Sequence, residues 1–250
     1  MYKVSSVSYT NSIPFVYGLK HGTVANSISL SLDIPSLCAQ KVISQQVDIG
    51  LVPVAAIPLV PNANIISNYC IGAVGRVNTV LLYSEVPLAE IKTILLDFQS
   101  RTSIALVQIL CKEYWHISPQ FIQASEGYEA QIGENIAGVV IGDRCFNLTQ
   151  KYSFNYDLSQ AWYGLTGLPF VFACWVANKP LPEAFIKEFN SSLEIGLNAI
   201  AKARQELLNP NVDDALAKDY LENVISYTFD ESKKIALDLF LEKLKILTLC

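Results

Sequence analysis

Residues 3–53 of the chain read KVSSVSYTNSIPFVYGLKHGTVANSISLSLDIPSLCAQKVISQQVDIGLVP, a stretch in which strand-like and helix-like segments alternate. In order, they predict a strand over Lys3–Tyr9, a helix over Ser12–Lys20, a strand over Ser29–Asp33, a helix over Pro35–Gln46 and a strand over Asp48–Val52. Such alternation is typical of a parallel sheet with crossover helices. The sequence therefore predicts an α/β fold.

The rest of the chain continues the pattern and indicates a second sheet. Further strands are predicted at residues 70–74, 79–83, 94–97, 136–141 and 170–176, and further helices at residues 100–115, 182–203, 212–223 and 230–247. The order of these segments indicates a chain that leaves one lobe and later returns to it. We expect lobe I to hold residues 1–84 and 177–250, and lobe II residues 85–176. Each lobe would be a mixed sheet flanked by helices, with a ligand cleft between the lobes.

Composition excludes several classes of protein. The 250 residues are 51% apolar and 16% charged with a formal net charge of −5, so no nucleic-acid partner is expected. Two histidines and no C-x-x-C pair argue against a metal site. No apolar stretch predicts membrane insertion and no signal peptide is visible, so a cytoplasmic location is expected. The six cysteines, among them Cys250, are expected to be reduced, and all but Cys250 to be buried.

A cluster of hydrogen-bond donors lies between a predicted strand and a predicted helix, at Ser100-Arg101-Thr102-Ser103. The first turn of a helix leaves backbone N–H groups without partners, and the helix dipole attracts an anion there. Hydroxyl groups and an arginine at the same point suit a carboxylate. The alternative is a plain N-cap by Ser100, with Arg101 in solvent.

Three other turns could likewise bind a ligand or have a purely structural role. Asn11 lies in the first βα turn, where open α/β sheets bind ligands, but it could also cap its helix. Asn78 and Thr79 follow a tight turn and could face a ligand, or the turn could be a plain hairpin connection. Gly142 and Asp143 follow an apolar strand, where Asp143 could again be a helix cap. No serine-hydrolase, P-loop or dinucleotide motif is present, so the residues alone do not give a reaction.

Seven stretches, taken together and in order, resemble the chorismate dehydratase family of the futalosine route to menaquinone. They are VSYTNSIP at 7–14, DIGLVPV at 48–54, VLLYSEVPL at 80–88, SRTS at 100–103, VIGD at 140–143, YDL at 156–158 and WYGLTGLPFVFA at 162–173. The helices beyond residue 173 match only in helical character. Gly75-Arg76 departs from the Gly-Pro pair of many relatives.

The resemblance implies a type II periplasmic-binding-protein-like fold and a hydro-lyase reaction, in which chorismate loses water to give 3-[(1-carboxyvinyl)oxy]benzoate. It implies no metal and no organic cofactor, a dicarboxylate substrate, and a monomer or homodimer. It also implies roles: Ser100, Arg101 and Thr102 hold a carboxylate, Asn78, Thr79, Gly142 and Asp143 contact the substrate, and Asn11 orients the reacting part. The substrate's own enolpyruvyl carboxylate is favoured as the base over Asp143.

Three alternatives compete with a chorismate dehydratase. A non-catalytic solute-binding protein would share the fold, although no export signal is visible. The related 1,4-dihydroxy-6-naphthoate synthase uses a histidine, for which His21 and His116 are badly placed. A ligand-sensing regulatory lobe would need a DNA-binding element, and neither a helix-turn-helix nor a basic face accompanies it.

Overall fold

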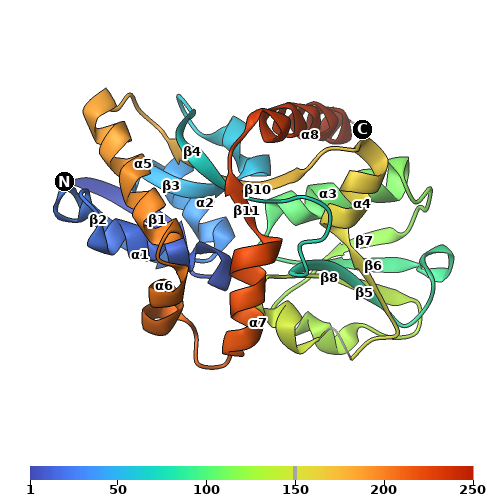
Figure 1. Cartoon of the computed structure of the whole chain (residues 1–250). Helices are drawn as coiled ribbons and strands as arrows, with labels where there is room; N and C mark the ends of the chain where they lie inside the picture. Colours follow the sequence, from blue (N-terminus) through green and yellow to red (C-terminus); the bar gives the residue numbers. More distant parts are fainter. Residues whose placement is uncertain (149–150, 250) are drawn as a thin grey trace. The chain divides into compact units, whose positions relative to one another are not determined.

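The computed structural model describes residues 1–148 and 151–249. The chain forms two compact units: unit 1 comprises Met1–Gly72 and Val171–Asp230, and unit 2 comprises Ala73–Phe170 and Glu231–Cys250. Each unit contains one sheet with helices packed on it (Figure 1). The predicted α/β class, with two mixed sheets flanked by helices, is confirmed.

The sheet of unit 1 contains six strands in the order β11-β4-β10-β3-β1-β2. Their bounds are β1 Tyr2–Val7, β2 Ile28–Asp33, β3 Ile49–Pro53, β4 Asn64–Ala73, β10 Phe170–Ala177 and β11 Ser226–Thr228. β1 is parallel to both β2 and β3, as the opening alternation of the sequence predicts. β10 joins β3 in the antiparallel sense, and β11 joins β4 in the same way.

The helices of unit 1 include a closely packed pair, α1 and α5, which lie side by side (Figure 1). The helical elements are η1 Thr10–Ser12, α1 Ile13–His21, η2 Ala25–Ser27, α2 Pro35–Ile43, η3 Val54–Leu59, α5 Glu183–Leu197, α6 Ile200–Leu207, α7 Asp214–Asp219 and η7 Tyr220–Val224. The single helix predicted over residues 182–203 is two helices, because α5 ends at Leu197 and α6 begins at Ile200.

The sheet of unit 2 contains five strands in the order β7-β6-β8-β5-β9. Their bounds are β5 Val80–Ser84, β6 Thr93–Leu96, β7 Gln120–Gln123, β8 Ile136–Ile141 and β9 Phe154–Asp157. The helical elements are η4 Leu88–Glu90, α3 Arg101–Glu113, η5 Tyr128–Gln131, η6 Gly142–Asn147, α4 Leu158–Thr166 and α8 Glu231–Leu249. β6 is parallel to β7 and β8, whereas β5 is antiparallel to β8 and β9.

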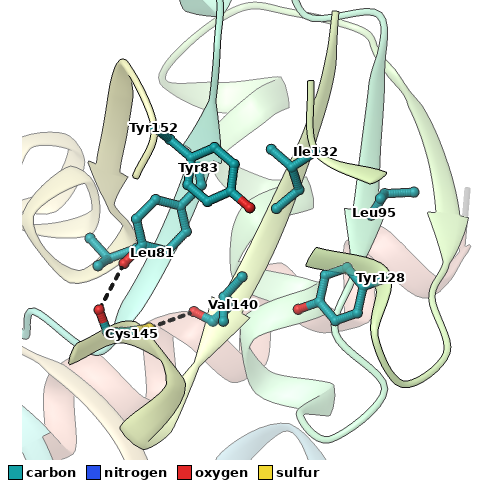
Figure 2. Close-up of a cluster of buried hydrophobic side chains, with 8 residues drawn as sticks. All are labelled: Leu81, Tyr83, Leu95, Tyr128, Ile132, Val140, Cys145 and Tyr152. Carbon is teal, nitrogen blue, oxygen red and sulfur yellow. Dashed lines mark hydrogen bonds between the residues drawn. The ribbon is translucent and has the colours of Figure 1, made fainter. Parts of the chain in front are cut away.

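One face of this sheet carries a buried cluster that fixes the turn after β8. Figure 2 shows its members: Leu81, Tyr83, Leu95, Tyr128, Ile132, Val140, Cys145 and Tyr152. The Tyr83 hydroxyl donates to the carbonyl oxygen of Cys145 at 3.3 Å, and the Cys145 thiol donates to that of Val140 at 3.3 Å. The rings of Tyr83 and Tyr152 lie 5.3 Å apart. Buried apolar packing of this kind holds η6 in one position.

The boundaries between the units differ from those expected from the sequence. Residues 73–84 belong to unit 2, because β5 pairs with β8 and β9. Residues 171–176 belong to unit 1, because β10 pairs with β3. Residues 231–249 belong to unit 2, where the Phe240 ring packs edge-on against Phe170 at 5.2 Å. The hairpin alternative for the turn before Thr79 is wrong, because β4 and β5 lie in different sheets.

The five described cysteines are buried thiols, as predicted. Burial raises the pKa of the Cys38 and Cys111 thiols to about 12, so both stay protonated and unreactive at neutral pH. Cys250 lies outside the described residues.

Candidate functional site

One edge of the unit 2 sheet gathers the polar turns that the sequence singles out. β6, β8 and β9 end at this edge and β5 begins there, because Val80 pairs with Ile141 and Leu81 pairs with Asp157. We call it the site edge. α3 and α4 both begin near this edge, since α4 follows directly from β9 and α3 follows β6 after residues 97–100. Two helix N-termini at one edge of a sheet favour anionic ligands.

The start of α3 carries three buried hydroxyl groups. Ser100 is its N-cap: the Oγ accepts from the Ser103 backbone nitrogen at 3.1 Å and donates to the Ser103 hydroxyl at 3.0 Å. The side chains of Ser100, Thr102 and Ser103 are buried, whereas Arg101 is exposed. The cap alternative for Ser100 is therefore correct. It satisfies one of the N–H groups that open a helix and does not exclude a ligand at the same turn.

Asp97, which directly follows β6, joins the turns after β6 and β8. It is fully buried, and its Oδ2 accepts from the Tyr128 hydroxyl at 3.0 Å and from the Ile141 backbone nitrogen at 3.2 Å. Arg144 forms an ion pair with Asp97 and a second one with Glu129. Burial raises the pKa of Asp97, and the charge of Arg144 opposes the rise. Sequence reasoning missed this role, although an aspartate directly after the apolar run ILL was a signal for it.

Gly142 and Thr79 lie next to one another at the site edge. The Gly142 backbone nitrogen donates to the Thr79 carbonyl oxygen at 2.9 Å, and Gly142 has a φ of +67°, which glycine adopts without strain. Thr79 is buried, and Asp143 is half-buried. The cap alternative for Asp143 is wrong, because η6 has Ile141 at its N-cap position and no capping side chain.

The turn that carries Asn78 is held by Asp157. One carboxylate oxygen of this buried residue accepts from the backbone nitrogens of Val77 at 2.9 Å and Asn78 at 2.7 Å. The other accepts from those of Ser159 at 3.0 Å and Gln160 at 3.1 Å and so caps α4. Burial raises the pKa of Asp157, and the four N–H donors oppose the rise. Asn78 is exposed, with a φ of +62°.

Asn11 belongs to unit 1, and it is not a helix cap. It lies inside η1, and α1 has Ser12 at its N-cap with no capping side chain. Its Nδ2 donates to the Tyr220 hydroxyl at 3.5 Å, and its carbonyl oxygen accepts from the Tyr227 hydroxyl at 3.0 Å. Sequence reasoning missed both tyrosines, which lie beyond the stretches that resemble the family.

The two histidines lie away from the turns of the site edge. At the end of α1, Nε2 of His21 lies within hydrogen-bonding distance of the Glu206 carboxylate, at 2.8 Å, and His116 is exposed after α3. Among residues 1–148 and 151–249, no group of three His, Cys, Asp or Glu side chains could hold a metal ion. No helix in this described part is both long and apolar enough to cross a membrane.

Each unit also has a hollow away from the predicted site residues. In unit 2, a hollow of about 620 Å³ lies between the end of α3, β7 and α8, lined by Lys112, Phe121 and Leu247 among others. In unit 1, one of about 330 Å³ is lined by Tyr69, Lys187 and Glu194 among others. Neither hollow is lined by a predicted site residue, although His116 lines the one in unit 2.

Two α/β units, with helix N-termini and hydroxyl groups collected at a sheet edge, are typical of the periplasmic-binding-protein class of fold. Solved structures agree. A protein of Archaeoglobus fulgidus superposes with a TM-score of 0.78 at 14% identity, over 100% of this chain and 98% of that one. The periplasmic aliphatic sulphonate binding protein of Escherichia coli gives a TM-score of 0.60 at 12% identity, over 99% and 91%. At these identities the likeness shows the fold alone.

The chain belongs to the menaquinone biosynthesis family, whose model matches residues 2–245. A chorismate dehydratase of Thermus thermophilus is 26% identical over 200 residues, which are 72% of this chain and 73% of that protein. A chorismate dehydratase of Campylobacter jejuni is 34% identical over 118 residues, 44% of this chain and 50% of that protein. The family resemblance read from the seven stretches is thereby confirmed.

Proposed function

We propose that this chain is a chorismate dehydratase that converts chorismate to 3-[(1-carboxyvinyl)oxy]benzoate and water in the futalosine route to menaquinone. The observation that carries the proposal is the family match over residues 2–245, together with relatives named for this activity. The proposal includes the cytoplasmic location expected of such a biosynthetic enzyme.

The reaction is an elimination that ends in an aromatic ring. A base removes the ring proton on the carbon that bears the ether oxygen, and the electron pair of that C–H bond delocalises through the diene toward the ring carboxylate. The C–O bond on the adjacent ring carbon, which bears the hydroxyl group, then breaks, and the hydroxyl leaves with a proton as water. Preorganised donors around the ring carboxylate stabilise the charge as it develops. Aromaticity supplies the driving force, so a protein that binds, orients and excludes water suffices.

The site edge supplies the donors that this chemistry needs. Ser100, Arg101 and Thr102 hold the ring carboxylate at the start of α3. Asn78 and Thr79, with Gly142 and Asp143 beside them, contact the same substrate. The closeness of Gly142 to Thr79 and the buried hydroxyls at α3 support this grouping. Asn11 orients the reacting part of the substrate.

The substrate's own enolpyruvyl carboxylate is proposed as the base. Two buried carboxylates lie at the site edge, and both already accept several hydrogen bonds from the protein: Asp97 from Tyr128 and Ile141, and Asp157 from four backbone N–H groups. Burial raises the pKa of both groups, but these hydrogen bonds occupy their oxygens. A carboxylate carried by the substrate reaches the ring proton without breaking hydrogen bonds inside the protein.

The direct test is turnover. The purified protein, dialysed against EDTA, is mixed with chorismate, and the aromatic product is followed by ultraviolet absorbance and identified by NMR. We expect conversion without added metal or cofactor, and Asn11→Ala should lower kcat far more than it lowers Tm. Chorismate that stabilises the protein but stays unchanged would show a binding protein. No binding and no turnover would overturn the proposal altogether.

A further inference from the structure

Two tyrosines from the far end of the chain hold Asn11. Tyr220 accepts from the Asn11 side-chain amide at 3.5 Å, across 209 positions of sequence. Tyr227 donates to the Asn11 carbonyl oxygen at 3.0 Å, across 216 positions. Asn11 is therefore held at its backbone by Tyr227 and contacted at its side-chain amide by Tyr220, and both tyrosines lie in its own unit.

The tyrosines are themselves firmly placed. Tyr220 opens a π-helical turn, η7, in which the Ile225 backbone nitrogen donates to the Tyr220 carbonyl oxygen at 3.0 Å. Such turns are rare and occur frequently at functional sites. Tyr227 lies in β11, which pairs with β4, and its ring packs edge-on against Phe15 at 5.2 Å. Tyr220 and Tyr227 are 3% and 9% exposed, so both hydroxyls act inside the protein.

The contact to Tyr220 sets the direction of the amide. When Nδ2 is turned toward Tyr220, Oδ1 points the opposite way and presents one acceptor in a constant place. A donor–acceptor distance of 3.5 Å is long for such a bond, so the contact adds little to the stability of the fold. Burial raises the pKa of the Tyr227 hydroxyl well above its usual value, so this hydroxyl remains a donor to the Asn11 backbone at neutral pH.

We propose that Tyr220 is a positioning residue that acts through Asn11 in the dehydration reaction. The inference rests on the proposed function, in which Asn11 orients the substrate. Because Tyr220 acts on the direction of the amide, loss of its hydroxyl disturbs the reacting geometry more than substrate affinity. A small misplacement of a reacting group lowers the reaction rate strongly.

The test is a double-mutant cycle on Tyr220→Phe and Asn11→Ala, with kcat, KM and Tm measured for each protein. Tyr220→Phe should lower kcat about tenfold, with KM and Tm close to wild type. In the Asn11→Ala background, the same change should have almost no further effect, because residues that act together are non-additive. Tyr69→Phe, which removes a hydroxyl from the neighbouring strand β4, is the matched control and should leave kcat unchanged.

Two results would overturn the inference. One is additive losses of kcat across the cycle, and the other is a Tyr220→Phe protein with wild-type kcat. Both require a wild-type protein that turns over chorismate, so they differ from the failure of the proposed function, in which the wild type itself is inactive.

Discussion

Oδ2 of Asp157 lies 2.7 Å from the backbone nitrogen of Asn78. The other oxygen of the same carboxylate caps α4 through the backbone nitrogens of Ser159 and Gln160. One buried side chain therefore connects the start of a helix to the turn that carries two of the proposed substrate contacts, Asn78 and Thr79. The geometry of the site edge therefore depends on Asp157, a residue that was not expected to contact the ligand.

The Asp157→Asn variant should lose both stability and substrate affinity. The amide turns an acceptor into a donor that faces backbone N–H groups, and an unsatisfied buried group costs about 1–3 kcal/mol. We expect a lower Tm and a raised KM for chorismate. Asp213→Asn is the control, because Asp213 caps the exposed start of α7 and asparagine caps equally well. An Asp157→Asn protein with wild-type Tm and KM would contradict the role given to this carboxylate.

Two substitutions of Ser100 should distinguish its role as a helix cap from its proposed role in binding a carboxylate. Ser100→Ala removes the cap of α3, which costs about 1 kcal/mol, and also a hydroxyl group of the proposed carboxylate site, so Tm should fall and KM rise about tenfold. Ser100→Asp keeps a capping oxygen but sets a negative charge against the substrate carboxylate. Its Tm should be close to wild type while its KM is raised. If Ser100→Asp binds chorismate normally, the ring carboxylate does not lie at α3.

The packing of α1 on α5 should not tolerate a methyl group at two glycines. A Cβ at Gly18 would lie 2.0 Å from the Ser192 carbonyl oxygen, and one at Gly196 would lie 1.8 Å from that of Pro14. Backbone must move to relieve either contact, so Gly18→Ala and Gly196→Ala should each cost about 2 kcal/mol or more. Gly133→Ala, with nothing within 4 Å of the new Cβ, is the control. Urea unfolding measures all three, and equal stabilities would refute the close packing.

Acidic pH should lower the stability of unit 1, because Asp33 becomes protonated. Burial disfavours its charge, but hydrogen bonds from Lys41, Ser5 and Ser31 outweigh burial and lower its pKa. A carboxyl whose folded-state pKa lies below its unfolded value stabilises the fold above about pH 4, and this contribution is lost as the pH falls through the lowered pKa.

The corresponding measurement is Tm between pH 6 and pH 3. Wild type should be more stable than Asp33→Asn at pH 6, and the difference should shrink below about pH 4. Lys41→Gln removes the charged partner and should show a weaker dependence on pH than wild type. A difference between wild type and Asp33→Asn that is the same at every pH would rule out this explanation.

The local helices and strands and the chemical character of the turns can be predicted from the sequence alone. Apolar runs and caps are set by neighbouring residues, so the alternation over residues 3–53, the start of α3 at Ser100 and the strand before Gly142 are all found as predicted. Strands β7, β9 and β11 were missed, because they are three or four residues long and lack a sustained apolar pattern.

Which distant segments contact one another is seen only in the folded chain. β5 follows β4 in the chain yet pairs with β8 and β9, and that choice moved residues 73–84 from one unit to the other. Asp157 reaches Asn78 across 79 positions, and Tyr220 reaches Asn11 across 209. A hydrogen bond needs its two atoms within about 3.5 Å. The spacing of residues along a chain carries no such distance, so these partners exist only once the sheets have formed.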